Sequence, residues 1–262
     1  MKGSDLFVLR GDLDKRFHAI TFIIGLFFFL GLWQFVSTYL IAQSLLPSPI
    51  RVIAALKPLH LEDELVRNSL YSIKLNLLGY IEAILVALPL GFLIGLSPIL
   101  RSAVDPYVKS LRFLPLAAAT GIFIAWCGIG DFMKVQFLAV SIAVYLIPVV
   151  IQRINEVEEV YLQTAYTIGA SKLQTVFSVF VPAVVSRVWE DIRVLVAISW
   201  TYITIAEMLN MTGGVGALAV KCGRRSQIDK AFAVLLLIIV FGVIQDALFK
   251  WIGRKLFKYK YI

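Results

Sequence analysis

The sequence is poor in the residues that hold metals or form disulfides. It contains two cysteines, Cys127 and Cys222, which lie far apart and without metal-binding or redox spacing. Its two histidines, His18 and His60, lie at the edges of apolar segments, where histidines are usually solvated. We therefore expect no metal site, no catalytic residues and no cofactor bound by this chain.

Charge is also scarce. Charged residues make up 16% of the 262 residues, whereas 60% are hydrophobic, and the mean hydropathy is +0.85. Soluble domains are about 45–50% apolar and about 25% charged. A soluble fold of this length would need more polar surface, so the composition predicts an integral membrane protein.

Two kinds of motif are missing. No phosphate-binding loop of the form G-x-x-x-x-G-K-[ST] is present, so the chain does not bind ATP in the usual way. The acidic cluster Glu156, Glu158 and Glu159 has no histidine partner and is typical of a solvated helix start. This argues against a membrane-embedded enzyme acting on lipid. The other alternative is a free-standing secondary transporter, but the inverted repeats that mark many such transporters are not evident.

The net charge of +8 does not indicate a nucleic-acid-binding protein, because the basic residues punctuate apolar runs instead of forming a patch. Several of them gather near the C-terminus with aromatic residues, a combination that favours the cytoplasmic edge of a membrane. These residues are Lys250, Trp251, Arg254, Lys255, Lys258, Tyr259, Lys260 and Tyr261.

Six apolar segments predict an all-α polytopic membrane helix bundle of about six transmembrane helices, since a helix of about 20 apolar residues crosses a bilayer. A polar tail, 1–19, precedes them, and residues 20–262 form the membrane domain. The charged stretch 51–74 should include a short amphipathic helix outside the bilayer. The spans are expected at 20–41, 75–96, 114–129, 135–151, 194–209 and 231–252.

The distribution of basic residues predicts the orientation of these spans in the membrane. Six spans place both termini on one side of the membrane. The tail, the second and fourth connections and the C-terminal cluster hold 15 Lys and Arg residues, against 9 in the opposite loops. Because cytoplasmic loops are enriched in Lys and Arg, both termini are predicted to be cytoplasmic.

The segment 152–182, between the fourth and fifth spans, is the most informative. Small residues predict a short helix, a break and a second helix, and Gly169 permits a sharp turn at the break. Pro182 is expected in the first turn of the helix that returns to the membrane. The result is a compact helical knob on the cytoplasmic face. It either fits a groove in a partner or packs on lipid or on its own bundle, and the pattern leaves both open.

This segment resembles the EAA loop of binding-protein-dependent ABC importer permeases, whose pattern is E-A-A, then a glycine, then I-x-L-P. Gln163 replaces the acidic residue, and an amide can accept or donate a hydrogen bond but cannot pair with a cation. The positions that match the pattern are Gln163, Thr164, Ala165, Gly169, Val179, Val181 and Pro182.

Other segments, in the same order along the chain, are similar to the nitrate, sulfonate, taurine and bicarbonate branch of that family. Together they cover nearly the whole sequence, and their order is more specific than any one of them. The segments are 45–49 (LLPSP), 91–98 (GFLIGLSP), 111–115 (LRFLP), 126–130 (WCGIG), 199–201 (SWT), 206–209 (AEML) and 213–216 (GGVG).

The resemblance implies a non-catalytic permease subunit in a bacterial inner membrane, importing a small anion such as nitrate, sulfonate, taurine or bicarbonate. It further implies a homodimer of permeases, a substrate-binding protein that delivers the solute, and two separate ATP-binding-cassette ATPases that bind ATP and Mg²⁺. The residues expected to couple to the ATPases are Gln163, Thr164, Ala165, Gly169, Ala170, Ser171 and Pro182.

Five residues are candidates for the translocation path: Glu82, Arg193, Trp200, Thr201 and Glu207. Charged groups within spans usually face a cavity or a partner, and Arg193 would offset the desolvation of an anion. For Glu207 we expect a structural role, either pairing with a base or capping an interrupted helix. For all three charged residues, an internal ion pair or hydrogen bond is favoured over contact with substrate.

Overall fold

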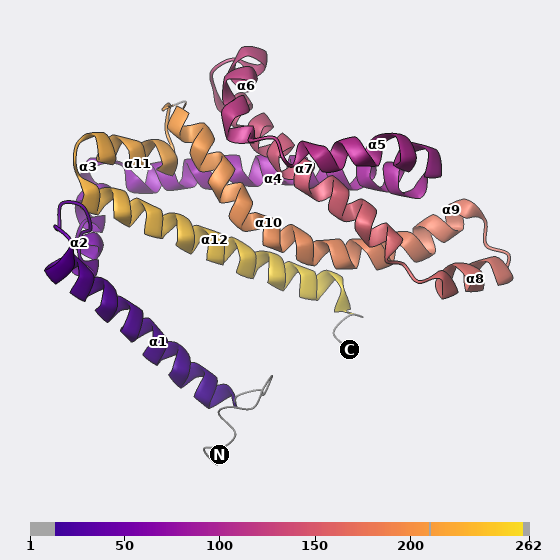
Figure 1. Cartoon of the computed structure of the whole chain (residues 1–262), viewed down its shortest axis with the longest axis horizontal. Coiled ribbons are helices and arrows are strands. Elements are labelled where there is room, and N and C mark those ends of the chain that lie inside the picture. The colour runs from indigo at the N-terminus through magenta and orange to yellow at the C-terminus, as the bar shows by residue number, and fades with distance from the viewer. Residues whose placement is uncertain (1–13, 210, 259–262) are drawn as a thin grey trace.

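The computed structural model describes residues 14–209 and 211–258, and every regular element in these ranges is a helix (Figure 1). The predicted all-α class is therefore confirmed. In chain order the elements are α1 (Lys15–Phe35), η2 (Val36–Leu40), α2 (Pro49–Ala54), α3 (Leu56–Glu62), α4 (Leu65–Leu96), α5 (Pro98–Leu111), η3 (Leu116–Ala119), α6 (Thr120–Cys127), α7 (Asp131–Asn155), α8 (Glu159–Thr167), α9 (Lys172–Thr175), η4 (Val176–Phe180), α10 (Val181–Leu209), α11 (Val215–Arg224) and α12 (Ile228–Leu256).

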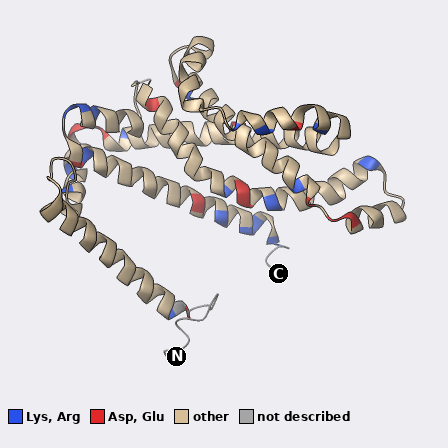
Figure 2. Cartoon of the chain, in the orientation of Figure 1, with Lys and Arg blue, Asp and Glu red and all other residues tan. Residues whose placement is uncertain are grey.

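Five helical runs in the described ranges are long and apolar enough to cross a membrane, and a sixth crossing exists if one bent pair counts as a span. The runs are α1 with η2, α4, α7, α9 to α10, and α12. Most charged residues lie toward the ends of these helices, and α1 and the first half of α12 carry long uncharged stretches (Figure 2). Most of the predicted tail, 1–13, lies outside the described residues, and α1 begins at Lys15.

The third predicted span, 114–129, is not a single membrane helix. α5 and the unit of η3 and α6 meet at 87°. α6 has eight residues, which is about 12 Å of helix against a hydrocarbon core of about 30 Å. Pro115 precedes η3, and Gly128, with φ +72°, ends α6. Apolar composition suggested a span here, but these two residues limit the length of the helix.

Two other predicted spans start too late. α4 begins at Leu65 instead of residue 75. The serines of its first turns, Ser69 and Ser72, are buried, and the Ser69 hydroxyl donates to the carbonyl of Leu65. The fifth span is part of one continuous helical run from Lys172 to Leu209. Its charged residues form ion pairs with α7 and α12, so they lie within the helix instead of ahead of it.

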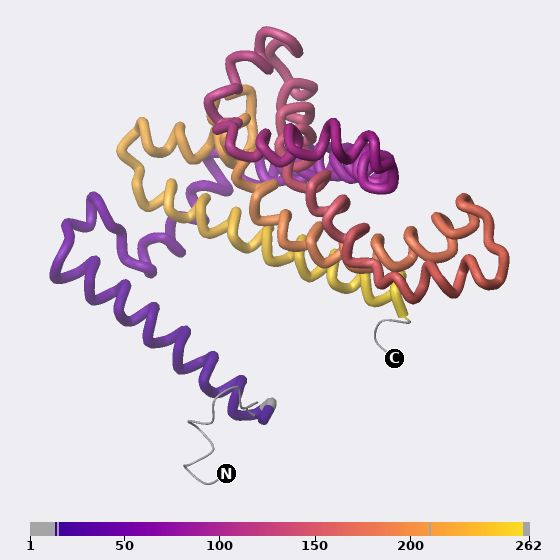
Figure 3. Tube along the Cα trace, turned by 45° about the vertical axis from the view of Figure 1, so that its right-hand side comes forward, coloured from indigo at the N-terminus to yellow at the C-terminus, as the bar shows by residue number. Residues whose placement is uncertain are grey.

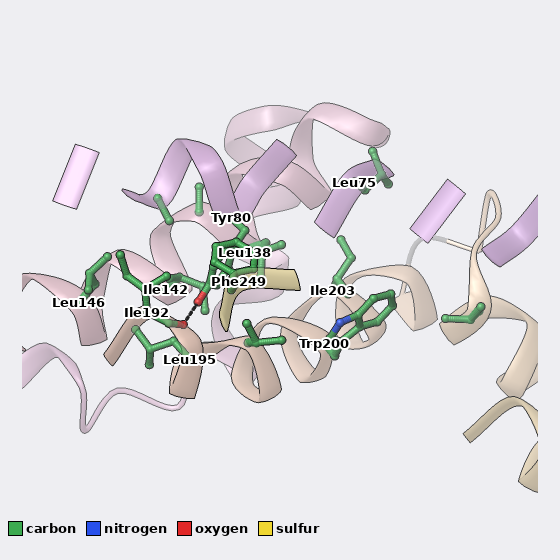
Figure 4. Close-up of a cluster of buried hydrophobic side chains, with 14 of the residues drawn as sticks. Leu75, Tyr80, Leu138, Ile142, Leu146, Ile192, Leu195, Trp200, Ile203 and Phe249 are labelled. Carbon is green, nitrogen blue, oxygen red and sulfur yellow. Dashed lines mark hydrogen bonds between the residues drawn. The ribbon is translucent and has the colours of Figure 1, made fainter. Parts of the chain in front are cut away.

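The core lies between α4, α7, α10 and α12 (Figure 4). Tyr80 of α4 is fully buried, and its hydroxyl donates a hydrogen bond to the carbonyl of Ile192 on α10. Its ring meets Phe249 of α12 edge-on, with 5.6 Å between the ring centroids. Leu138 and Ile142 of α7 are fully buried in the same cluster. One aromatic side chain thus contacts two other helices of the bundle.

A stripe of small residues lets α7 lie close against α4. A Cβ at Gly91 would lie 2.6 Å from the Cβ of Val150, and one at Gly95 would lie 2.6 Å from the Cδ1 of Ile154. Without side chains at these points the helices approach closely, as small-xxx-small patterns allow in membranes. The stripe repeats every four residues and is buried throughout: Gly79, Ala83, Ala87, Gly91 and Gly95.

Replacing Gly91 by alanine should overpack this contact and lower the free energy of unfolding by about 1–3 kcal/mol. The measurement is unfolding of the purified protein in mixed micelles with increasing SDS. Gly25→Ala on α1 is the matched control, because a Cβ at Gly25 meets nothing within 4 Å. The control should lose no stability, and an equal loss in both variants would contradict the close packing of α4 on α7.

α1 stands apart from the bundle and diverges from α12 in both orientations (Figures 1 and 3). None of its most apolar window is buried. Its contacts with the rest of the chain lie near its C-terminal end, where Trp33 donates to the carbonyl of Pro47 at 3.0 Å and stacks 6.4 Å from Phe232 of α12. An apolar helix with so little contact must be covered by lipid or by another chain.

Candidate functional site

The helical knob, residues 159–180, projects from one end of the bundle (Figure 1). Its first helix, α8, ends in a complete Schellman motif. The N–H of Ala170 donates to the carbonyl of Ala165 at 2.9 Å, and the N–H of Gly169 donates to that of Tyr166 at 3.0 Å. Gly169 has φ +76°, a conformation that favours glycine. The predicted break is therefore a specific turn that depends on this glycine.

The second helix of the knob, α9, has its N-cap at Ser171, two residues after that glycine. Ser171 and Gln174 form a capping box: the Ser171 hydroxyl accepts from the N–H of Gln174 at 3.3 Å, and the Gln174 amide oxygen accepts from the N–H of Ser171 at 2.8 Å. One helix is thus ended and the next begun within a few residues. Local hydrogen bonds therefore fix the turn between α8 and α9.

A hollow of about 500 Å³ lies between the two halves of the knob. Four of the seven predicted coupling residues line it, namely Thr164, Ala165, Gly169 and Ala170, while Gln163, Ser171 and Pro182 do not. The Gln163 side chain is exposed to solvent. Two exposed apolar side chains, Tyr161 and Ile168, line the hollow. Elsewhere on the knob, Tyr166, Leu173 and Phe177 are also exposed. Exposed apolar surface of this kind marks a site that contacts another protein or the membrane.

Pro182 lies in the first turn of α10, as predicted, but α10 does not start from a loop. The chain is already helical from Lys172, and the π-helical segment η4 leads directly into α10. Proline removes one backbone donor and crowds the preceding turn. A π-helical turn just before it accommodates this change without breaking the helix. The knob therefore continues into the membrane helix without an intervening loop.

A groove of about 670 Å³ runs between α10 and α12. Its walls are mostly apolar and include Trp200 and Thr201 from α10 and Gly242 from α12, while Arg193 and Asp246 lie at one end. The groove brings together three of the five predicted path residues, Arg193, Trp200 and Thr201. Thr201 is exposed, and its hydroxyl donates to the carbonyl of Ala197 at 3.2 Å.

Arg193 does not present a free positive charge to this groove. Its Nη1 donates to Glu190 at 2.6 Å, and its Nε and Nη2 donate to the two carboxylate oxygens of Asp246 at 3.1 and 3.2 Å. Two carboxylates thus surround one guanidinium. The arginine joins α10 to α12 through the kind of internal ion pair that the sequence favoured.

A buried polar network at the floor of the groove was not predicted. The indole N–H of Trp200 donates to Oε1 of Gln245 at 2.7 Å, and the Gln245 amide donates to Oδ1 of Asn76 at 3.1 Å. The Asn76 amide in turn donates to the hydroxyl of Ser199 at 3.0 Å. Amides within apolar runs, as at Asn76 and Gln245, were the available signal, because such groups bond across helices in membranes. The network joins α4, α10 and α12.

Glu207 caps a helix. It is fully buried, accepts from the hydroxyl of Ser72 at 2.6 Å and accepts from the N–H of Gly216, in the first turn of α11, at 2.9 Å. A carboxylate at a helix N-terminus satisfies free N–H groups and interacts favourably with the helix dipole. A Cβ at the preceding Gly214 would lie 2.2 Å from the Cδ of Glu207. Of the structural roles expected for Glu207, the geometry matches the helix cap.

Lys134, which sequence reasoning placed in an external loop, is fully buried in α7. Its ammonium group donates to the hydroxyl of Tyr71 at 3.1 Å and to that of Thr212 at 2.9 Å. The Tyr71 hydroxyl donates in turn to Asp131. Nothing in the local sequence marks this lysine, since its partners lie far away in the chain. It fixes the loop after α10 to α4 and α7.

The remaining path candidate, Glu82, lies away from the groove. Its carboxylate accepts from the side-chain amide of Gln136 on α7 at 2.8 Å, and it is half-buried between α4 and α7. At the end of the bundle opposite the knob, Lys230 donates to the buried Asp63 at 2.7 Å and holds the pKa of that carboxyl below its usual value. Neither contact requires a ligand.

Within the described ranges, no group of three His, Cys, Asp or Glu residues could hold a metal ion.

The bundle and its knob define the fold of ABC importer permeases. An inward-facing methionine ABC transporter shares it with a TM-score of 0.61, at 18% identity, over 74% of this chain and 94% of that one. A bacterial ABC transporter that imports the polysaccharide alginate shares it with a TM-score of 0.59, at 15% identity, over 91% of this chain and 92% of that one. At this level of identity the likeness concerns the fold.

Sequence comparison identifies the protein family. The model of the binding-protein-dependent transport system inner membrane components matches residues 87–258, and the chain belongs to this family. The predicted resemblance is confirmed, and the chain is a multi-pass transport permease. A lipid-modifying enzyme and a free-standing transporter, the alternatives left by the sequence, have no support.

Several named relatives match over most of their length. A putative aliphatic sulfonates transport permease of Bacillus subtilis is 27% identical, over 88% of this chain and 84% of that protein. The taurine transport system permease of Escherichia coli is 25% identical, over 91% of this chain and 90% of that protein. A nitrate import permease of Synechococcus elongatus is 26% identical, over 90% of this chain and 88% of that protein. The predicted branch of the family is thereby confirmed.

Proposed function

We propose that this permease imports a small anion and is driven by separate ATPase subunits that dock on the helical knob. The observation that carries the proposal is the knob itself, which combines a hydrogen-bonded turn, a hollow of about 500 Å³ and exposed apolar side chains, of which Tyr161 and Ile168 line the hollow. Such a surface fits a groove or pocket of a protein partner. Gln163 is available there for hydrogen bonding, so docking rests on shape and apolar contact more than on a salt bridge.

Energy comes from the partners in this proposal. The sequence has no phosphate-binding loop, so ATP and Mg²⁺ are bound by two ATP-binding-cassette subunits, one for each copy of a permease homodimer. An external binding protein delivers the solute at the opposite end. The knob and the C-terminal end of α12 lie toward the same end of the bundle (Figure 1). Together with the larger number of Lys and Arg residues in the segments that the sequence assigns to the cytoplasmic side, this supports cytoplasmic termini in a bacterial inner membrane.

The substrate class is proposed from the relatives, which are described as permeases for sulfonates, taurine and nitrate. We propose that Trp200 and Thr201 line part of the path in the groove between α10 and α12. Arg193, Glu207 and Glu82 are proposed to act structurally, because each is held by groups of the protein itself. A path with paired charges would not trap an anion, and selection would rest with the binding protein.

The docking proposal is tested by affinity purification of the tagged chain in mild detergent, with mass spectrometry of the proteins that co-purify. A P-loop ATPase and an untagged second copy of the chain should be recovered. Ile168→Asp places a charge on the rim of the hollow, where Ile168 is 79% exposed. It should lower ATPase recovery at least about tenfold, because central apolar contacts carry much of the binding energy of an interface.

Ile99→Asp is the matched control, since Ile99 is 80% exposed at the start of α5. It should leave ATPase recovery unchanged. Recovery of no ATPase with the wild-type chain would overturn the proposed function. Equal recovery with both variants would show that the partner docks elsewhere.

A further inference from the structure

Two stems join the helical knob to the bundle, and one arginine contacts both. The entering stem is the last turn of α7, and the leaving stem is α10. Arg153 lies on the entering stem. Its Nε and Nη2 donate to the two carboxylate oxygens of Asp191 on α10, each at 2.7 Å. A bidentate pair of this kind fixes orientation as well as charge.

The same guanidinium also binds Glu156, the C-cap residue of α7, three residues before the knob begins. Its Nη1 donates to Oε2 of Glu156 at 2.8 Å, and Gln152 donates to Oε1 at 2.9 Å. These hydrogen bonds, that from Arg153 above all, hold the pKa of Glu156 below its usual value, so its carboxylate stays ionised at neutral pH. From the other stem, Arg187 of α10 donates to the main-chain carbonyl of Glu156 at 2.9 Å. The junction is therefore held from both helices.

This cluster differs from an ordinary surface ion pair. The side chains of Arg153 and Asp191 are 29% and 21% exposed, and they join two helices. The pair of Lys109 and Asp105 lies four residues apart on α5 and joins no two elements. Exposed ion pairs contribute little to stability. The bidentate pair of Arg153 and Asp191, called the fork below, is partly buried and joins two helices, so it resists their relative movement.

We propose that Arg153 is a positioning residue for energy coupling. By holding the two stems of the knob together, it makes α7 and α10 move as one when a partner ATPase displaces the knob. The inference rests on the proposed function, since it requires an ATPase that acts on the knob. Without the fork, the knob turns on its stems and the displacement is lost before it reaches the membrane helices. ATP is then hydrolysed without a matching movement of substrate.

The test uses the complete complex in proteoliposomes, with its ATPase and binding protein, and measures substrate uptake and ATP hydrolysis in the same vesicles. Arg153→Gln should lower uptake per ATP hydrolysed by about tenfold, within the range of coupling between distant sites. Arg153→Lys keeps the charge but loses the fork and should give an intermediate ratio. The exchange Arg153→Asp with Asp191→Arg should recover part of the ratio. Lys109→Gln is the control and should leave it unchanged.

A purely structural role predicts a different result. Uptake and ATP hydrolysis would then fall in proportion as complex is lost, and the ratio would stay constant across the variants. That outcome would overturn the proposal. If Arg153→Gln does not assemble, Arg153→Lys and Arg187→Gln decide, because both should assemble and show a lowered ratio. A wild-type chain that binds no ATPase would instead overturn the proposed function, which separates the two failures.

Discussion

Replacing Gly214 by alanine is expected to remove most of the folded protein and nearly all uptake. Gly214 has φ +102° and ψ 167°, a backbone region open essentially to glycine alone. A Cβ there would lie 2.2 Å from the Cδ of Glu207 and push the carboxylate away from the N–H of Gly216. Backbone strain of about 1–3 kcal/mol then adds to about 1–3 kcal/mol for a buried group that loses its hydrogen bonds. Proteins are stable by only about 5–15 kcal/mol.

Gly128 provides the control for this prediction. Its φ of +72° and ψ of −173° lie in the same glycine region, but a Cβ there would meet nothing within 4 Å. Gly128→Ala should therefore show the backbone part of the loss alone, when both variants are unfolded by SDS in mixed micelles. Adding Glu207→Ala to Gly214→Ala removes the group that the new methyl strikes, so the combined loss should be smaller than the sum. Strictly additive losses would contradict the contact.

Replacing Gly169 by valine is expected to abolish uptake while leaving membrane insertion intact. Gly169 has φ +76°, which costs other residues about 1–2 kcal/mol and β-branched ones more. The Schellman turn that orients α9 on α8 would be lost, and with it the shape that the ATPase is proposed to recognise. A Cβ at Gly169 meets nothing within 4 Å, so the bundle itself is undisturbed. Uptake by intact cells, with the membrane content of the protein measured in parallel, checks both parts.

A graded series distinguishes backbone shape from side-chain bulk at this position. Asparagine tolerates the left-handed conformation, so Gly169→Asn should retain much of the uptake, with Gly169→Ala between asparagine and valine. Normal uptake with valine would remove the coupling role of the turn. Equal loss with asparagine and valine would show that the partner needs the absence of a side chain and not the turn.

The knob could be predicted from the sequence because its signals are local. Gly169, where the break was predicted, ends one helix, and Ser171, two residues later, caps the next, each through hydrogen bonds with nearby residues. The apolar runs likewise predicted the all-α bundle, since length and composition alone decide whether a helix can span a bilayer. The helix cap by Glu207 was one of two structural roles expected from a buried carboxylate.

The remaining features depend on residues that are distant in sequence. Lys134 seemed to belong to a loop because its partners, Tyr71 and Thr212, are brought to it only by the folded bundle. The run 172–209 stays helical through charged residues because α7 and α12 supply their counter-ions. Conversely, the apolar segment 114–129 is cut short by backbone geometry at Pro115 and Gly128, which average hydrophobicity does not measure.

The close contact of α4 with α7 has a mechanical consequence. Val150 occupies the space that a side chain at Gly91 would fill, and Ile154 occupies the space that a side chain at Gly95 would fill. Either helix can therefore slide past the other only if these two side chains leave those spaces. Packed interiors resist such shear and switch between discrete arrangements instead. The pair therefore behaves as a single lever arm. Relative movement within the bundle is therefore easier at other contacts, such as the groove between α10 and α12.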